Sequence, residues 1–422
     1  MLSGTATFLA RSLSAALLFG ALAWQAVAAD APAAGPAPAA GTAPAGFVHA
    51  DGLVIKDENN KELRLRGVNL GGWLLWEGWI WGGGYDAETP IARRMEEVLG
   101  AQGARDFRNQ VYSRFITEKD IARIAAMGFN AVRVPINHRL LDDAGPGVPK
   151  DAGWQVLDRL LDWCEKHRVY VVLDLASAPG GQSKYFCADP DDGGRLWDSE
   201  DNQARTALWW KAVAARYKDR RIIAGYDLLD EPIPPDGAKL VALYKRILAA
   251  VREVDRRHLV FLQGADFSRD LSVFSGPLDP NQAYTFHMYT WLQFLSDDRG
   301  KLLEQFRTVA RAHRVPLWNG EFGENTPEML ESTVALLEDP ANLVTGHCFW
   351  TWKKAPNKYP ALVSFDPPEG WKTLLSWVSG SWFTRKPSPE AAAEAVRGFL
   401  ASAEIDRGAE DARLREILHL SK

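Results

Sequence analysis

The stretch IIAGYDLLDEP, from Ile222 to Pro232, decides the fold that the sequence predicts. It is a short, mostly apolar run with β-branched residues at its start, which is typical of a strand buried on both faces of a sheet. It ends in two adjacent carboxylates, Asp230 and Glu231, and Pro232 then begins a loop because it has no N–H to give to a sheet. Charge at the end of a buried strand is costly unless it is paired or used, so this strand end is a candidate site.

A second stretch has the same form. VPLWNGEFGE, from Val315 to Glu324, is an apolar run that reaches Glu321 and then a glycine-containing loop. If both strands belong to one parallel barrel or sheet, their carboxyl ends lie on the same rim, and Glu231 and Glu321 face each other across a cleft. Two carboxylates in that arrangement are what acid–base chemistry on a glycosidic bond requires.

Strand-like and helix-like segments alternate along the rest of the chain. Helical spacing is found over 117–127, where Thr117 and Asp120 form a capping box, and over 154–166, 202–217 and 238–254. Strands are expected over 67–70, 129–136, 169–175, 222–229, 258–263, 283–287, 315–321 and 343–350. Eight strands with helical segments between them predict an α/β fold, the (β/α)8 TIM barrel. We expect an N-terminal β-hairpin before it, with a turn at 58–60, and a C-terminal helical extension after it.

Several of the expected strands end in a polar or aromatic residue. These residues are Asn69, Arg133, Asp174, Asp230, Glu231, Gln263, His287, Tyr289, Glu321, Trp350 and Trp352. In a barrel such side chains converge on the carboxyl rim, where active sites lie. Taken singly, each is better explained by a structural role, and Arg133 could be only a buried cation paired with a carboxylate. Their recurrence at strand ends is what indicates a site.

Composition limits the partners. The 422 residues are 46% hydrophobic, enough for a large core, and a net charge of −5 gives no basic footprint for nucleic acid. The 17 tryptophans suit either the apolar faces of sugar rings or a large core. Four of them lie in GGWLLWEGWIWGGG, residues 71–84, which is either a hydrophobic plug over one end of the fold or a wall of a sugar cleft.

The N-terminus predicts export. Arg11 precedes an apolar run that ends in Ala26-Val27-Ala28, the small-x-small pattern of a secretory cleavage site. We expect a signal peptide over 1–29, an Ala/Pro-rich linker over 30–46, the barrel domain over 47–387 and the helical extension over 388–422. The mature protein is then periplasmic or secreted, with no stable membrane insertion after cleavage, and we expect a monomer.

Two features leave alternatives open. The Ala-rich segment EAAAEAVRGFLASAEI has a spacing that suits an amphipathic helix packed on the barrel or a contact with another protein. The three cysteines, Cys164, Cys187 and Cys348, allow at most one internal disulfide, and their spacing suits no metal site.

Seven motifs together carry a family resemblance. They are RGVNLGGW, GFNAVRVPINHRLL, the LDLASAPGGQ stretch ending at Gln182, ARYKDRRIIAGYDLLDEP, FHMY, GEFG and FWTWK. In order and spacing, from about residue 52 to about 382, the sequence resembles glycoside hydrolase family 5, the cellulase family. The resemblance implies a retaining glycoside hydrolase that cleaves β-glucosidic linkages by double displacement and needs no metal or organic cofactor.

The resemblance also assigns roles. Glu231 falls on the family's acid/base and Glu321 on its nucleophile, while Arg133 falls on the arginine that supports the nucleophile. His287 and Tyr289 fall on the pair after the sixth strand, and Trp350 on the aromatic platform under the reacting sugar. The substrate implied is a β-glucan or related polysaccharide or oligosaccharide, with 1,4 and 1,3 linkages, bacterial exopolysaccharide and glycolipid heads all open.

Two positions depart from the family pattern. The family usually carries Asn before the acid/base glutamate, where this chain has Asp230, and often His at the end of the third strand, where it has Ala176. An Asp cannot donate as an amide does, and its charge favours a protonated Glu231. We therefore expect hydrolysis with altered specificity or rate. The rival hypothesis is a carbohydrate-binding or transglycosylating barrel with weakened hydrolysis, because a fold does not certify its function.

Overall fold

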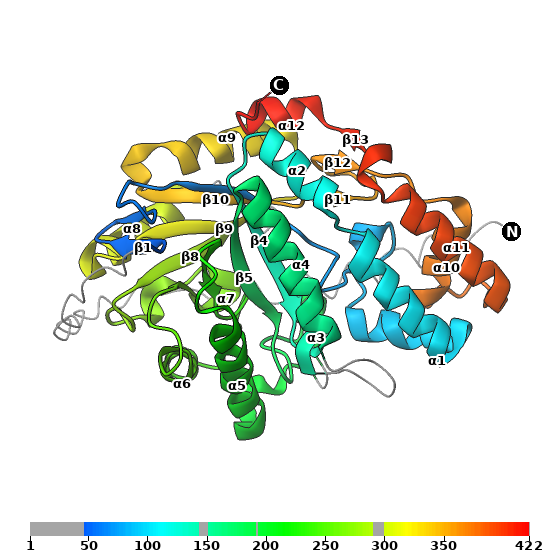
Figure 1. Ribbon diagram of the computed structural model, residues 1–422, viewed down its shortest axis with the longest axis horizontal. Helices are drawn as coiled ribbons and strands as arrows, with labels where there is room; N and C mark the ends of the chain where they lie inside the picture. Colours follow the sequence, from blue (N-terminus) through cyan, green and yellow to red (C-terminus); the bar gives the residue numbers. More distant parts are fainter. Residues whose placement is uncertain (1–45, 143–150, 191–192, 290–298, 422) are drawn as a thin grey trace, which may run out of the picture. The chain divides into compact units, whose positions relative to one another are not determined.

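The computed structural model describes residues 46–142, 151–190, 193–289 and 299–421 (Figure 1). The signal peptide and all but the last residue of the linker fall outside the described residues, so they and the domain boundaries stay predictions. Among the residues that are described, no helix has the length and apolarity of a membrane span.

Eight parallel strands close into a barrel at the centre of Figure 1. They are β3 (Leu65–Asn69), β4 (Ala131–Asn137), β5 (Tyr170–Ser177), β6 (Ile223–Asp227), β7 (Leu259–Gln263), β8 (Gln282–Met288), β9 (Leu317–Gly323) and β10 (Val344–Trp350). Each strand pairs with its sequence neighbour, and β10 closes the ring on β3. The predicted (β/α)8 barrel is confirmed, strand by strand.

Helices follow the strands and cover the barrel from outside. They are α1 (Glu88–Arg114), α2 (Glu118–Ala126), α3 (Arg139–Asp142), α4 (Ala152–His167), α5 (Glu200–Tyr217), α6 (Gly237–Arg252), α7 (Ala265–Ser268), α8 (Arg299–His313) and α9 (Pro327–Glu338). The predicted capping box is present at α2, because Asp120 accepts hydrogen bonds from both the backbone and the hydroxyl of Thr117, at 2.8 and 2.9 Å. That contact fixes where the helix begins.

The N-terminal hairpin is also present, but its regular strand pairing lies around Gly52, earlier in the chain than the predicted turn at 58–60. Strand β1 (His49–Asp51) pairs antiparallel with β2 (Val54–Lys56) around Gly52, whose φ of +64° suits glycine. The predicted turn at 58–60 follows, but it closes only the single bridge between Lys56 and Glu62. The alternating pattern in the sequence predicts that the chain reverses in this region. It does not predict which of the two turns, at Gly52 or at 58–60, closes the regular pairing, because that depends on the left-handed conformation of Gly52.

The Trp-rich segment is a buried plug. Trp73, Trp76 and Trp81 are at most 1% exposed, and the segment contains one 3-10 turn, η1 (Gly78–Trp81). Trp81 packs against Trp371 and Phe399 with ring centroids 6.1 and 5.4 Å apart. These indoles therefore belong to the core, which resolves the alternative that the sequence left open for them.

The C-terminal segment packs on the barrel exterior. It follows α10 (Glu369–Val378) and contains α11 (Pro389–Ser402) and α12 (Ala412–Ile417), and α11 lies beside α10 and α1 at the right of Figure 1. The rings of Trp371 and Phe399 stack at 4.0 Å between α10 and α11. The segment also holds one short strand, β13 (Ala409–Glu410), which pairs with β12 (Val363–Ser364) beside β11 (Lys353–Lys354). The extension is therefore helical with one added strand.

Candidate active site

Arg133 lies at the centre of the rim on β4 and is fully buried. Its guanidinium donates to Asp227 at 2.9 Å, to Asp230 at 2.6 Å and to Glu321 at 2.5 Å, and Asp174 lies 3.1 Å away. One cation cannot neutralise four buried carboxylates, so some of them must hold protons. Burial accordingly raises the pKa of Asp174 well above its usual value, and it raises the pKa of Asp227 as well.

Glu231 lies beyond the end of β6, which stops at Asp227, two residues earlier than the sequence predicts. Its φ is +40°, in the left-handed region, and its N–H donates to Oε1 of Gln263 at 2.8 Å, which holds the turn. Burial raises the pKa of Glu231 well above its usual value, and the negative charge of Asp230 raises it further. Both effects favour the protonated form of this carboxyl, which is the form that a general acid needs.

Glu321 lies on β9 and has a donor at each oxygen. Arg133 donates to Oε1 at 2.5 Å, and the hydroxyl of Tyr289 donates to Oε2 at 2.9 Å. Burial raises the pKa of Glu321 to about 8, while the charges of His287 and Arg133 act in the opposite direction. Hydrogen bonds to both oxygens favour the ionised form and fix the direction of the carboxylate.

His287, on β8, brings the two glutamates together. Its Nδ1 lies 2.9 Å from Oε1 of Glu231 and 3.6 Å from Oε2 of Glu321. These two oxygens are therefore at most about 6.5 Å apart. The carboxyl groups of inverting glycosidases are separated by about 6.5 Å or more, and those of retaining glycosidases by about 5 to 5.5 Å, so the bound is compatible with a retaining enzyme. The predicted pair thus meets at one place on the rim.

The two departures from the family pattern are joined by one side chain. Gln182 donates from Nε2 to the backbone carbonyls of Ala176, at 2.7 Å, and Asp230, at 2.9 Å. The carboxylate of Asp230 turns inward, where it accepts from Arg133 and, at 3.2 Å, from Gln263. The sequence alone does not predict the bridge that Gln182 makes, because it joins a backbone carbonyl of β5 to one that lies beyond the end of β6.

Trp350 ends β10 at the same rim, as predicted, and is 6% exposed. Its ring approaches Gly71 so closely that a Cβ there would lie 2.9 Å from Cη2. The indole is therefore fixed in place by the backbone of the Trp-rich segment. Its use as a sugar platform stays a prediction.

Three side chains at the rim offer a set of possible metal ligands. One atom each from Asp230, His287 and Glu321 lies within 4.8 Å of the others. Arg133 already contacts both carboxylates of that set, at 2.6 and 2.5 Å. A divalent cation there would lie against a fixed positive charge, so these residues fit an organic substrate better than a metal.

Two residues near the pair were not predicted as site residues. Glu77 accepts from the indole N–H of Trp79 at 2.7 Å, and burial raises the pKa of Glu77 to about 8, with Asp230 and Glu231 adding to the increase. Cys187 lies with Sγ 3.8 Å from Oε2 of Glu231, and all three cysteines are free thiols. An acid inside WEGW is a signal that could have identified Glu77, whereas nothing in the local sequence identifies Cys187.

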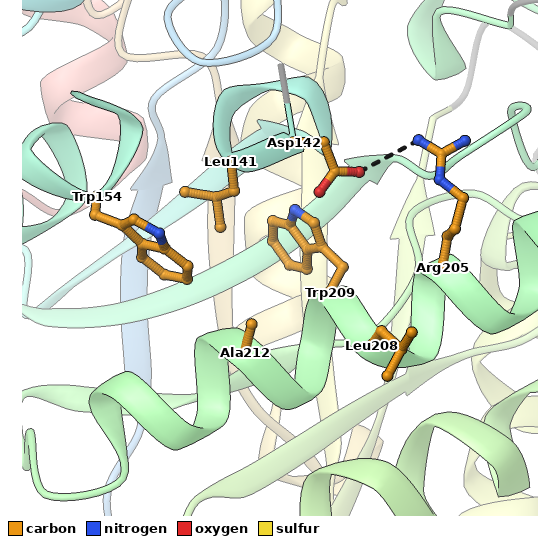
Figure 2. Close-up of a pocket in the computed structure, with 7 residues that line it drawn as sticks. All are labelled: Leu141, Asp142, Trp154, Arg205, Leu208, Trp209 and Ala212. Carbon is orange, nitrogen blue, oxygen red and sulfur yellow. Dashed lines mark hydrogen bonds and ion pairs between the residues drawn. The ribbon is translucent and has the colours of Figure 1, made fainter. Parts of the chain in front are cut away.

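A separate surface pocket of about 420 Å³ lies on the outside of the barrel (Figure 2). Leu141 and Asp142 of α3 and Trp154 of α4 line it together with Arg205, Leu208, Trp209 and Ala212 of α5. Asp142 and Arg205 form an ion pair at 3.4 Å in its wall. None of the predicted site residues lines this pocket, so it is distinct from the rim.

Comparison with known proteins finds relatives among glycosidases. The family described as Cellulase (glycosyl hydrolase family 5) matches residues 93–356. The chain is 35% identical over 294 residues to a β-xylosidase of Phanerodontia chrysosporium, an alignment covering 66% of this chain and 61% of the relative. It is 31% identical over 228 residues to Endoglucanase C of Acetivibrio thermocellus, covering 53% of this chain and 65% of the relative. The chain thus spans less than two thirds of the length of these relatives.

Solved structures share the fold. A rutinosidase from Aspergillus niger superimposes with a TM-score of 0.59 at 20% identity, covering 71% of this chain and 92% of that one. A β-glucanase from Saccharophagus degradans, solved in complex with cellotetraose, superimposes with a TM-score of 0.53 at 16% identity, covering 85% of this chain and 94% of that one. At such identities the likeness concerns the barrel itself.

Proposed function

This chain belongs to the cellulase family, glycosyl hydrolase family 5, and from that premise we propose that it cleaves β-glucosidic linkages in a β-glucan or related saccharide with retention of configuration. Membership makes it a glycosidase acting on β-glycosidic bonds. The linkage, the sugar and the double-displacement mechanism are the proposal. Relatives named as an endoglucanase, a glucan 1,3-β-glucosidase and a β-xylosidase support a β-linked saccharide as the substrate.

The observation that carries the proposal is the contact of one imidazole with both glutamates. Because Nδ1 of His287 lies 2.9 Å from Glu231 and 3.6 Å from Glu321, both carboxyls can reach one anomeric centre. Glu321 attacks the anomeric carbon as the carboxylate, the form that the donors Arg133 and Tyr289 favour against the burial that raises its pKa. Glu231 gives its proton to the leaving oxygen and then takes one from the water that hydrolyses the glycosyl ester on Glu321.

A second candidate activity, transglycosylation, is favoured by Asp230. The charge of Asp230 supports the protonated form of Glu231 that the first step needs. In the second step Glu231 acts as the base, and Asp230 cannot donate to the sugar 2-hydroxyl as an amide does. Loss of that contact, which strengthens in the transition state, slows attack by water and lengthens the life of the glycosyl ester. A sugar hydroxyl arriving in that time would be glycosylated instead. Products longer than the starting oligosaccharide would reveal this activity.

The proposal is tested by a screen of aryl β-glycosides, β-1,4-glucan and β-1,3-glucan with wild type, Glu321→Gln and Glu328→Gln. Glu328 is an exposed carboxylate seven residues on, at the start of α9, and serves as the matched control. We expect Glu328→Gln to match wild type and Glu321→Gln to lose at least 1,000-fold in rate, about 4 kcal/mol of transition-state stabilisation. Equal sugar release by all three proteins would instead indicate a carbohydrate-binding barrel.

The proposed location is outside the cytoplasm, in the periplasm or secreted. Its support is the apolar run and Ala26-Val27-Ala28 pattern of the N-terminus. Mass spectrometry of the protein recovered from its native host tests this, because cleavage at the predicted site removes the first 28 or 29 residues. A mature protein that still begins at Met1 would contradict the export prediction.

A further inference from the structure

Two adjacent aromatic side chains lie almost entirely in solvent. Trp382 and Phe383, in the loop between α10 and α11, are 98% and 99% exposed, whereas most large aromatic residues of the described chain are buried. A fully exposed Trp-Phe pair presents a few hundred Å² of apolar surface, the size at which an exposed patch on a protein indicates a binding surface.

The backbone of this loop is built to present the pair. The N–H of Thr384 donates to the carbonyl of Ser381 at 3.2 Å, which closes a turn with Trp382 and Phe383 as its two corner residues. The N–H of Ser381 donates to the carbonyl of Ser376 at 3.0 Å, and the hydroxyls of Ser376 and Thr384 are hydrogen-bonded at 2.7 Å. Turn corners normally carry small polar residues, so aromatic residues held there require a separate explanation.

Cations lie at the base of the loop. The guanidinium of Arg94 and the ammonium of Lys386 both lie over the ring of Trp377, at 5.1 and 5.9 Å from its centroid. Arg385 is exposed between the turn and Lys386. Two acids lie near the loop base: Glu97 is paired with Arg94 at 3.1 Å, and Asp86 accepts from the hydroxyl of Ser379 at the end of α10. The three cations Arg94, Arg385 and Lys386 outnumber these two acids, on a chain whose net charge is −5. We name the set of Trp382, Phe383, Arg385, Lys386 and Arg94 the aromatic–basic loop.

We propose that the aromatic–basic loop docks the enzyme on the surface of an anionic lipid bilayer. Tryptophan and phenylalanine insert at the boundary between headgroups and acyl chains, while nearby lysine and arginine are attracted to anionic lipid. A polysaccharide is a poorer fit, because a sugar needs hydrogen-bond partners for its hydroxyls beside the stacking ring. Here the hydroxyls of Ser376 and Thr384 bond each other, and the N–H groups of Ser381 and Thr384 are used within the loop.

The test is co-sedimentation of the mature chain, residues 30–422, with vesicles of phosphatidylcholine alone or mixed with phosphatidylglycerol. The variant W382S/F383S removes the aromatic pair and keeps turn-compatible residues, and Leu208→Ser, at a side chain 62% exposed in the wall of the surface pocket, is the matched control (Figure 2). We expect wild type and Leu208→Ser to bind the anionic vesicles, less at high salt, and W382S/F383S to bind at least tenfold more weakly. Hydrolysis of an aryl glycoside should be the same in all three, which confirms that each is folded.

A charge variant gives a second measurement. Arg385→Glu should weaken binding to the anionic vesicles about fivefold or more, and leave binding to pure phosphatidylcholine unchanged. Failure of wild type to bind either vesicle overturns the proposal. Equal binding by wild type and W382S/F383S also overturns it, since other residues would then hold the lipid. Loss of binding to insoluble glucan, instead of vesicles, in W382S/F383S would assign the loop to polysaccharide.

Discussion

Replacing Asp230 by asparagine removes a negative charge near Glu231 and keeps an oxygen that can accept from Arg133 and Gln263. The charge of Asp230 disfavours ionisation of Glu231 and so raises its pKa. Removing the charge must lower that pKa. Because the basic limb of kcat/KM reports loss of the acid's proton in the free enzyme, the basic limb should move to lower pH.

The size of this shift in the basic limb can be worked out from the imidazole of His287, which lies between the carboxylates of Asp230 and Glu231. Nε2 of His287 lies 3.8 Å from Asp230 and Nδ1 lies 2.9 Å from Glu231, so the charges are at most about 9 Å apart and interact by roughly 2 kcal/mol at an effective dielectric constant of about 20. Arg133, 2.6 Å from Asp230, cancels part of this. A net effect of about 1 kcal/mol corresponds to a shift of somewhat less than one pH unit.

The assay is the pH dependence of kcat/KM on an aryl glycoside for wild type, Asp230→Asn and Asp227→Asn. Asp227 also accepts from Arg133, at 2.9 Å, but it lies on β6 itself and not beside Glu231 in the chain, so its variant controls for loss of a carboxylate from the cluster. We expect a clearly larger downward shift for Asp230→Asn. A basic limb that stays in place or moves upward would refute the role given to Asp230.

Three further substitutions test separate contacts. Tyr289→Phe removes the donor that lies 2.9 Å from Oε2 of Glu321, and a hydrogen bond to a charged group contributes about 1.5 to 3 kcal/mol, so kcat/KM should fall roughly 10- to 150-fold; unchanged kinetics would contradict this. Arg133→Met leaves buried carboxylates without their cation, so urea denaturation should show a loss of about 3 to 5 kcal/mol in the free energy of unfolding, and a loss below about 1 kcal/mol would be inconsistent. Glu77 has a pKa of about 8 when folded against 4.5 ordinarily, so between these values the unfolded chain has lost a proton that the folded protein keeps. The free energy of unfolding of wild type should then fall as pH rises, by up to roughly 1.4 kcal/mol per pH unit from this group. The Tm of Glu77→Gln minus the Tm of wild type should therefore increase from pH 5 to pH 8. A constant difference would argue against a buried neutral Glu77.

The barrel could be predicted from the sequence because its strands are buried on both faces. Each appears as a short apolar run ending in a polar or aromatic residue, and the carboxyl ends of parallel strands must share one rim. This is why Glu231 and Glu321, 90 positions apart in the chain, could be predicted to meet. The exact end of β6 could not, because a left-handed residue at Glu231 and its bond to Gln263 depend on a neighbouring strand.

Contacts between side chains and loops across the rim are the features of the candidate site that sequence periodicity could not predict. Gln182 joins two backbone carbonyls, Cys187 approaches Glu231 from the loop after β5, and Glu77 enters from the Trp-rich plug. Each lies in a segment without regular spacing, where a sequence pattern indicates only that a loop is present. The exposure of Trp382 and Phe383 is equally a property of one turn, since the same residues in a helix would have been expected in the core.

The central claim is that Glu231 and Glu321 act on one anomeric carbon by double displacement, and the anomeric form of the first product tests it most directly. The measurement is proton NMR of the sugar released in the first minutes from a β-linked substrate, before mutarotation mixes the anomers. Two successive inversions predict that the β-anomer appears first and the α-anomer accumulates later. Initial release of the α-anomer would mean a single displacement by water, and would contradict the nucleophilic role of Glu321.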